Sequence, residues 1–248
     1  RTALVTGGAK RIGAAIAADL AKHGFSVAIH CRQSREEADT LSARIARAGG
    51  RAKVFAADLA DVEATEKLVG RVRERMGPID LLVNNASFFE RDAAERFEAE
   101  KWEAHFAMHA RAPVQLAGAF ARQMEIEAGL IVNIVDQRVW RLNPNYFSYT
   151  LSKAVQWTAT RTLAQALAPR IRVNAIGPGP TLKSDRQTEA DFAAQIAGLP
   201  LRRGPTLAEF GATIRYLFDT PSVTGQMIAL DGGQHLPWET PDIAGIPE

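Results

Sequence analysis

Cysteine is nearly missing from this chain of 248 residues: Cys31 stands alone, so no disulfide can form within the chain. That agrees with a reducing compartment. Long hydrophobic runs are missing too, because no apolar stretch approaches the roughly 18–20 residues that cross a bilayer. The N-terminus begins in an apolar strand pattern and not in a basic and then apolar leader. These absences predict a soluble, cytoplasmic protein without membrane contact.

An excess of charge of one sign is also lacking. The chain has 30 basic and 28 acidic residues, a formal net charge of +2, and no basic block of the kind that follows a phosphate backbone. We therefore expect no nucleic-acid partner. The hydrophobic fraction of 46% over 248 residues is enough for a full core. We expect residues 1–248 to form a single domain.

What the chain does contain is an alternation of short apolar runs with longer amphipathic segments, which is typical of βαβ units. We expect strands at 2–5, 26–31, 52–56, 81–83, 130–135, 172–175 and 227–230. Helical spacing predicts helices at 12–23, 35–48, 62–76, 101–123, 146–168 and 207–218. The predicted fold class is α/β: a single doubly wound, Rossmann-type parallel sheet of about seven strands, flanked by helices on both faces.

Two segments interrupt this regularity. Pro113 lies inside the predicted helix 101–123, so we expect a kink or break there. Residues 177–201 lack clear periodicity, and their Gly-Pro-Gly-Pro start leads into a polar stretch. Such a segment is either a mobile lid or a surface loop, and we expect it to be the substrate loop.

A glycine-rich turn, TGGAKRIG at residues 6–13, follows the first strand and opens a helix. Small residues let backbone N–H groups approach a pyrophosphate, and the helix N-terminus adds positive potential. A plain tight turn is the alternative, but the position at the first βα junction and the two cations favour phosphate binding. The expected phosphate-binding residues are Gly7, Lys10, Arg11 and Ile12.

The end of the second strand addresses the identity of the cofactor. An acidic residue there holds the ribose 2′-hydroxyl in NAD sites, whereas a 2′-phosphate needs cations and hydroxyl donors. The sequence offers Arg32 and Ser34, with no acid before Glu36. This pattern favours NADPH/NADP+ as the cofactor.

Tyr149 and Lys153 stand four residues apart near the start of an amphipathic helix, so both project from one face. A nearby ammonium is expected to lower the pKa of the phenol and let Tyr149 exchange a proton with a substrate. The Y-x-x-x-K spacing alone arises often by chance. With the phosphate turn upstream, it predicts a catalytic pair.

Together these motifs resemble the short-chain dehydrogenase/reductase family over essentially the whole chain. The motifs that carry the resemblance are Thr6-Gly7…Gly13, Asp58-Leu59, Asn84-Asn85-Ala86, Asn133-Ile134, Tyr149…Lys153, Asn174…Pro178-Gly179 and Leu230-Asp231-Gly232-Gly233. The resemblance implies a seven-stranded sheet and, commonly, a homotetramer. It also implies further cofactor contacts: Asp58 and Leu59 would border the adenine, Asn85 and Ala86 the ribose, and Pro178 and Gly179 the nicotinamide.

Asp136 departs from the family pattern. Most members have a serine thirteen residues before the tyrosine, and that serine hydrogen-bonds a substrate carbonyl. An ionised carboxylate has no proton to donate and repels a developing alkoxide, so a simple ketone is a poor match. A substrate rich in N–H groups is a better one, and a protonated Asp136 would relay a proton through Tyr149. Asp136 therefore joins Tyr149 and Lys153 as an expected catalytic residue.

The pteridine reductase branch of the family resembles this sequence further. It pairs a Lys-Arg phosphate turn with an aspartate in place of the serine, and it has an aromatic residue shortly after the Asn-Asn-Ala-Ser stretch at 84–87. The resemblance implies that Phe89 stacks on a flat pterin, while Arg11 and Ser87 reach pterin or phosphate groups. Packing in a core or lid is the alternative for Phe89. The expected substrate contacts are Arg11, Ser87, Phe89, Asp136 and Tyr149.

Two alternatives stay open. A carbonyl or 3-oxoacyl reductase of the same family is opposed by Asp136. A non-catalytic NADPH-binding sensor is permitted by His109, which stands where the family has a relay asparagine, and is opposed by the intact Tyr149 and Lys153. His105 and His109 have a zinc-compatible spacing but no third ligand nearby in the sequence, so we expect no metal.

Overall fold

The computed structural model describes residues 1–123, 125–184, 186–239 and 244. Its centre is a seven-stranded sheet in the order β3-β2-β1-β4-β5-β6-β7, and every pairing is parallel. This confirms the predicted fold class. The strands are β1 (Thr2–Val5), β2 (Ser26–Cys31), β3 (Arg51–Ala56), β4 (Leu81–Asn84), β5 (Gly129–Ile134), β6 (Ile171–Pro178) and β7 (Met227–Leu230).

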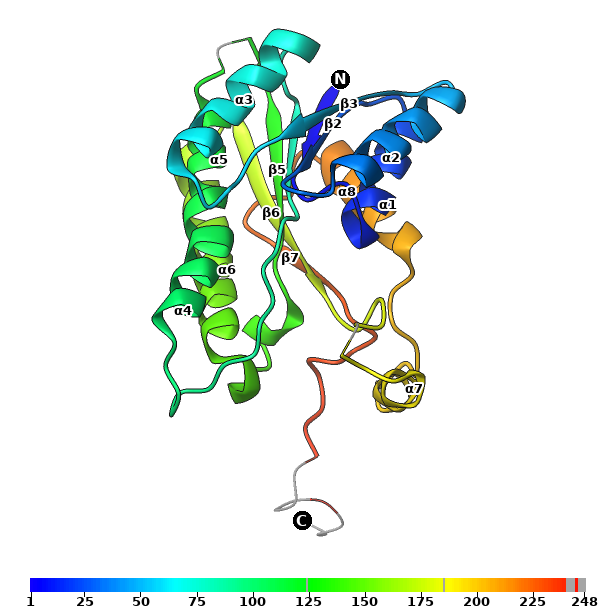
Figure 1. Ribbon diagram of the computed structural model, residues 1–248, viewed down its shortest axis with the longest axis vertical. Helices are drawn as coiled ribbons and strands as arrows, with labels where there is room; N and C mark the ends of the chain where they lie inside the picture. Colours follow the sequence, from blue (N-terminus) through cyan, green and yellow to red (C-terminus); the bar gives the residue numbers. More distant parts are fainter. Residues whose placement is uncertain (124, 185, 240–243, 245–248) are drawn as a thin grey trace.

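Helices cover both faces of the sheet (Figure 1). On one face lie α1 (Arg11–Lys22), α2 (Arg35–Arg47) and α8 (Leu207–Asp219). On the other lie α3 (Val62–Met76), α4 (Ala99–Phe106), α5 (Ala112–Ala121) and α6 (Phe147–Leu167). Successive residues of β1 feed two separate cores: Ala3 and Val5 pack with α1 and α8, whereas Leu4 packs with α3 and α5. Burial on both faces explains why the central strands β1, β4 and β5 consist mainly of apolar residues.

The strand order reverses between β1 and β4, and this fixes where a ligand can bind. The chain leaves β1 toward α1 on one face, and it leaves β4 toward α4 on the other. The diverging connections leave a crevice at the carboxyl ends of the strands, which is the usual ligand position in open α/β sheets.

The helix predicted at 101–123 is interrupted, as Pro113 suggested. A π-helical turn, η1 (Ala107–Arg111), separates α4 from α5, and Pro113 lies in the first turn of α5. The chain stays helical from 99 to 121, so the π turn directly before Pro113 is a local widening of one long helix. The π turn also contains the buried His109.

The prediction for residues 177–201 is wrong in part, because this segment contains a helix, α7 (Glu189–Ala197). The hydroxyl of Thr188 accepts from the backbone N–H of Asp191, and the Asp191 carboxylate accepts from the N–H of Thr188. This capping box starts a helix where apolar periodicity is weak. Residue 185 lies outside the described residues. In Figure 1, α7 lies beyond the carboxyl ends of the strands.

Within the described part of the chain, no helix combines the length and the apolar character that crossing a membrane requires.

Candidate active site

The crevice at the strand ends is a cleft of about 590 Å³. It unites most of the residues expected from the sequence, although they come from separate parts of the chain. Those that line it are Gly7, Lys10, Arg11, Ile12, Asn85, Ala86, Ser87, Phe89, Asp136, Tyr149, Lys153, Pro178 and Gly179. Arg186, which precedes α7, and Phe192 within it also line the cleft.

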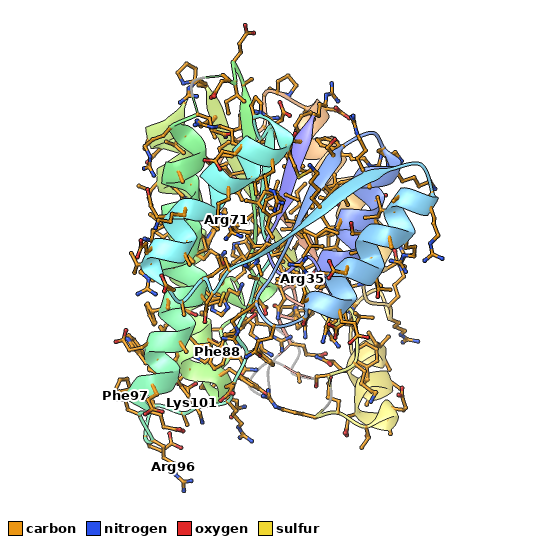
Figure 2. The ribbon with its side chains drawn as sticks, turned by 45° about the horizontal axis from the view of Figure 1, so that its top comes forward. Arg35, Arg71, Phe88, Arg96, Phe97 and Lys101 are labelled. Carbon is orange, nitrogen blue, oxygen red and sulfur yellow. The ribbon has the colours of Figure 1, made fainter. Side chains whose placement is uncertain are left out.

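A second hollow, of about 540 Å³, lies at the start of α4 and is lined by Phe88, Glu90, Glu98, Ala99, Glu100 and Lys101. Figure 2 shows Phe88, Phe97 and Lys101 gathered at this end of the molecule. The ammonium of Lys101 already bonds the Glu98 carboxylate at 2.8 Å and the Arg91 carbonyl at 3.2 Å. No predicted catalytic residue lines this hollow, so the cleft at the strand ends is the candidate active site.

The glycine-rich turn needs its glycines. Gly7 has a φ of +59°, and a Cβ there would lie 2.9 Å from the Cα of Ala86. A Cβ on Gly13 would lie 2.2 Å from the carbonyl oxygen of Gly7. A side chain at either glycine would therefore collide with the backbone that packs the turn. The N–H groups in the first turn of α1 have no acceptor inside the helix. These N–H groups at the start of α1 form a cradle of donors that fits the pyrophosphate of a dinucleotide.

Asn85 and Thr6 hold this turn against β4. The Asn85 side-chain amide donates to the carbonyls of Thr6 at 2.9 Å and Gly7 at 3.1 Å. The Thr6 hydroxyl accepts from the N–H groups of Asn85 and Ala86 at 2.9 and 3.0 Å. The predicted Asn85 and Ala86 are thus bonded directly to the phosphate turn.

His30 is a positioning residue that the sequence reasoning missed. Its Nδ1 accepts from the Gly7 N–H at 3.1 Å, so the proton is on Nε2, which donates to the Ala57 carbonyl at 3.1 Å. Burial lowers the pKa of His30 from 6.5 to about 4. The neutral ring thereby ties together the phosphate turn, β2 and the segment after β3. Its place on a buried strand gave no sequence signal for this role.

The residues expected at the adenosine end lie outside the cleft itself. Arg32 is exposed where β2 ends, and Ser34 occupies the N-cap of α2 without a capping bond from its side chain. Exposed Asp58 accepts from the N–H of Ala60 at 2.9 Å, and Leu59 is buried. Figure 2 shows Arg35 where α2 begins, and its guanidinium bonds Asp39 at 2.8 Å.

Lys10 and Arg11 have protein partners in this structure. The ammonium of Lys10 forms an ion pair with Glu37 of α2. The guanidinium of Arg11 donates to the carbonyls of Leu182 at 3.2 Å and Lys183 at 3.3 Å. Arg11 also has a φ of +50°, which is uncommon for a residue with a Cβ. It therefore connects the phosphate turn to the segment that precedes α7.

Tyr149 and Asp136 face each other at the inner end of the cleft. The Tyr149 hydroxyl donates to Asp136 Oδ2 at 2.9 Å, while Asp136 Oδ1 accepts from the N–H of Arg138 at 2.8 Å. Burial raises the pKa of Tyr149 well above its ordinary value, and the Asp136 carboxylate raises it further. The prediction that Lys153 lowers the pKa of Tyr149 is therefore wrong, and the phenol keeps its proton.

Lys153 is fully buried beside Tyr149. Its ammonium donates to the Ile134 carbonyl at 2.8 Å and to Gln156 Oε1 at 3.1 Å, and it lies 5.8 Å from the centre of the Tyr149 ring. Burial lowers the pKa of Lys153 from 10.5 to about 8, against an opposing effect of Asp136. The ammonium therefore titrates close to neutral pH.

His109 occupies the place of the relay asparagine, but its bonds define a different role. Its Nε2 accepts from the N–H of Phe88 at 3.2 Å and lies 2.9 Å from the Ser87 hydroxyl. The proton is therefore on Nδ1, which donates to Ser152 Oγ at 2.9 Å. Burial lowers the pKa of His109 well below 6.5. The neutral ring fixes exposed Ser87 at the cleft and leaves no ring nitrogen for Lys153.

Phe89 lies in an aromatic and cationic group at the cleft. Its ring stacks on Tyr146 at 4.5 Å and meets Tyr149 edge to face at 4.7 Å. The Arg186 guanidinium lies 5.8 Å from the Phe89 ring and donates to its carbonyl at 3.1 Å. Arg138 contacts the same ring at 5.4 Å. Phe89 thus lines the cleft and also packs against the segment before α7. The sequence reasoning missed Tyr146, Arg138 and Arg186, which no motif marked.

Pro178, the last residue of β6, and Gly179, directly after it, also line the cleft. A Cβ on Gly179 would lie 2.6 Å from the Cα of Asp231, so only glycine fits there. Among the described residues, no group of three or more His, Cys, Asp or Glu side chains is arranged to hold a metal ion.

Comparison with known proteins agrees with this site. Residues 7–235 match the family model described as enoyl-(acyl carrier protein) reductase. A 3-oxoacyl-[acyl-carrier-protein] reductase from Synechocystis is 31% identical over 238 residues, which cover 94% of this chain and 96% of that relative.

Two solved structures are more similar. FolM alternative dihydrofolate reductase 1 from Brucella canis, complexed with NADP, is 58% identical with a TM-score of 0.95, and the match covers 98% of this chain and 96% of that one. The Brucella suis protein of the same name, also in complex with NADP, is 57% identical with a TM-score of 0.95, and 98% of each chain is covered.

The sheet order, the cleft and the family match define an oxidoreductase, as predicted. The chain belongs to the short-chain dehydrogenase/reductase family. The two FolM structures also confirm the resemblance to the pteridine reductase branch.

Proposed function

We propose that this protein is an NADPH-dependent reductase of dihydropterin-class substrates, with Tyr149 as the proton donor. The observation that carries the proposal is the bond of 2.9 Å between the Tyr149 hydroxyl and Asp136, because it puts an acceptor where a carbonyl reductase needs a donor. The similarity to two proteins named alternative dihydrofolate reductase, at 58% and 57% identity, supports it independently.

NADPH as the cofactor is supported by the NADP-bound neighbours and by the fit of the turn at 6–13. Gly7, Lys10, Arg11 and Ile12 would hold the pyrophosphate side. Arg32 and Ser34 would bind the 2′-phosphate. By the resemblance, Asp58 and Leu59 would contact the adenine, Asn85 and Ala86 the ribose, and Pro178 and Gly179 the nicotinamide.

Bound NADPH supplies a hydride to a carbon of the substrate. Tyr149 holds a proton that the adjacent ring nitrogen needs, because its raised pKa keeps the phenol protonated at neutral pH. Asp136 is partly exposed in the cleft, so its carboxylate can pass a proton from water to Tyr149 after each turnover. Lys153 places positive charge beside the ring of Tyr149 and stabilises a transient phenolate.

Substrate binding is assigned to Arg11, Ser87, Phe89, Asp136 and Tyr149. Ser87 is held by His109 with its hydroxyl at the cleft, and Phe89 offers an aromatic wall. Contact of Arg11 with substrate or phosphate requires it to release the carbonyls of Leu182 and Lys183. The proposal also includes a single domain over 1–248, with 177–201 at the substrate side, a homotetramer and a cytoplasmic location.

A second candidate is reduction of 3-oxoacyl or other carbonyl groups, favoured by the Synechocystis relative. Oxidation of NADPH, followed at its absorbance band with dihydropterins, ketones and 3-oxoacyl thioesters, separates the two, with NADH as the control. Turnover limited to dihydropterins supports the proposal, and turnover limited to carbonyl compounds replaces it with the second candidate. Binding of NADPH without turnover of any substrate would favour a sensor.

A further inference from the structure

Two consecutive residues of the cleft wall have buried polar atoms that no described group satisfies. They belong to the short 3₁₀ helix η2 (Gln137–Val139), directly after the catalytic Asp136. The side-chain oxygen Oε1 of Gln137 and the guanidinium nitrogen Nη1 of Arg138 are both buried without a hydrogen-bond partner among the described residues. Both residues line the cleft. Unsatisfied buried polar atoms are rare, and each calls for an explanation.

Gln137 is 5% exposed, so its amide oxygen has little access to bulk water. Leaving a buried acceptor unpaired costs about 1–3 kcal/mol. The backbone around it is fixed, since Trp140 donates its N–H to the Gln137 carbonyl at 2.9 Å. The oxygen is therefore an unpaired acceptor on a residue that lines the cleft.

Arg138 is held just as firmly. Its guanidinium carbon lies 4.9 Å from the ring centre of Tyr146, 5.4 Å from Phe89 and 5.7 Å from Tyr149. Its backbone N–H donates to Asp136 at 2.8 Å. Aromatic faces attract a guanidinium and fix its plane, but they leave its in-plane N–H groups without acceptors. Arg138 also forms no ion pair with the described acidic residues. Its guanidinium is therefore a donor that lies beside the rings of Phe89, Tyr146 and Tyr149.

We infer that Gln137 and Arg138 recognise the lactam edge of the substrate, meaning a ring carbonyl next to a ring N–H. An acceptor and a charged donor on adjacent residues match that edge, because Arg138 would donate to the carbonyl oxygen and Gln137 would accept from the N–H. This inference rests on the proposed function, since a dihydropterin has such an edge at C4 and N3. It assigns substrate selection to residues other than Arg11, Ser87, Phe89, Asp136 and Tyr149.

A 2,4-diaminopteridine tests the pairing because its amino group at C4 replaces the carbonyl and its N3 has no hydrogen. Dissociation constants of 7,8-dihydropterin and of this analogue are measured on the NADP+-loaded protein, for the wild type and for Arg138→Met, Arg138→Lys and Gln137→Met. Arg141→Met is the matched control, because Arg141 is a neighbouring exposed residue that does not line the cleft.

Arg138→Met is expected to weaken dihydropterin binding about tenfold or more, because a hydrogen bond from a charged donor is lost. Binding of the analogue should change less than about threefold. Arg138→Lys keeps the charge and one donor and should restore part of the loss. Gln137→Met should weaken dihydropterin about fivefold, the effect of losing a neutral hydrogen bond. Arg141→Met should change neither ligand.

Equal losses of affinity for both pteridines, or no loss for either, would overturn the inference. Turnover of dihydropterin by the wild type would still uphold the proposed function. A loss of NADP+ affinity in Arg138→Met would also overturn it, because the acceptor would then belong to the cofactor. If the wild type neither binds nor reduces any dihydropterin, the proposed function fails and this inference fails with it. Unchanged thermal unfolding of each variant shows that the fold is intact.

Discussion

The phenol of Tyr149 and the carboxylate of Asp136 share one hydrogen bond, of 2.9 Å, at the inner end of the cleft. Their ionisations oppose each other, because a charge on Asp136 makes a phenolate at Tyr149 more costly. Burial acts in the same direction and is the larger cause. Tyr149 is therefore held as a proton donor, and its deprotonation is limited to the moment when a substrate takes the proton.

Replacing Tyr149 by phenylalanine tests this role most simply. Tyr149→Phe removes the proton but keeps the ring, so kcat should fall about 100-fold or more, the usual contribution of general acid catalysis. The dissociation constant of NADPH should stay the same, as measured by fluorescence titration. Tyr146→Phe is the control, since Tyr146 also lines the cleft but has no bond to Asp136. Full turnover by Tyr149→Phe would show that another group donates the proton.

Asp136 distinguishes the substrate classes. Asp136→Ser restores the hydroxyl that most of the family has, so it should lower kcat/KM for dihydropterins and raise it for simple ketones. Removing the carboxylate should also lower the pKa of Tyr149, because Asp136 raises it. Steady-state rates with both substrate classes over a range of pH measure the two effects. A variant that loses ketone activity and keeps pterin activity would contradict the assignment.

Arg32 is expected to select NADPH over NADH. Arg32→Glu puts a carboxylate where the 2′-phosphate is expected and should weaken NADPH binding at least about tenfold, with little effect on NADH. Arg44→Glu, at an exposed residue in the last turn of α2, is the control for the change in net charge. An unchanged NADPH affinity in Arg32→Glu would place the phosphate elsewhere, and Lys10 would then be the next residue to test.

The lowered pKa of His30 predicts how the free energy of unfolding depends on pH. Its pKa falls from 6.5 to about 4 on folding, so the fold favours the neutral ring. This contribution is complete above pH 6.5 and is lost as pH falls from 6.5 toward 4. Between about pH 7.5 and about pH 5 the loss should be about 2 kcal/mol, from about 1.4 kcal/mol for each pH unit below 6.5.

Urea unfolding of the wild type and of His30→Asn at these two pH values measures this loss. His105 and His109 also have lowered pKa values and contribute in the same direction in both proteins. The difference between the two proteins therefore isolates His30, and the variant should lose less stability on acidification. Parallel pH dependences would show that folding does not lower the pKa of His30.

The centre of the sheet was predictable from the sequence because β1, β4 and β5 are buried at every residue and consist mainly of apolar residues. The edge strand β3 is only partly buried and contains Arg51 and Lys53. The cleft was predictable where a motif has a fixed physical role, as at Gly7, where positive φ and the approach of Ala86 permit no side chain. The helix α7 was missed, since its start depends on the polar pair Thr188 and Asp191 and not on apolar spacing. Helix capping of this kind gives a weaker signal than periodicity.

The residues of the site that escaped prediction act through tertiary contacts. His30 reads as an ordinary strand residue until Gly7 and Ala57 are brought to its two ring nitrogens. Arg138 reads as a surface arginine until Phe89 and Tyr146 surround it. The expected effect of Lys153 on Tyr149 was wrong for a similar reason, because spacing along a helix gives no measure of burial.

The most direct test of the account follows the hydride itself. The protein is incubated with NADPH deuterated at both C4 positions and with a 7,8-dihydropterin, and the product is analysed by mass spectrometry. The account predicts that the wild type forms a tetrahydropterin that contains one deuterium, and that Tyr149→Phe forms it about 100-fold or more slowly. Deuterium that appears only in alcohols from added ketones, with the dihydropterin recovered unchanged, would contradict it.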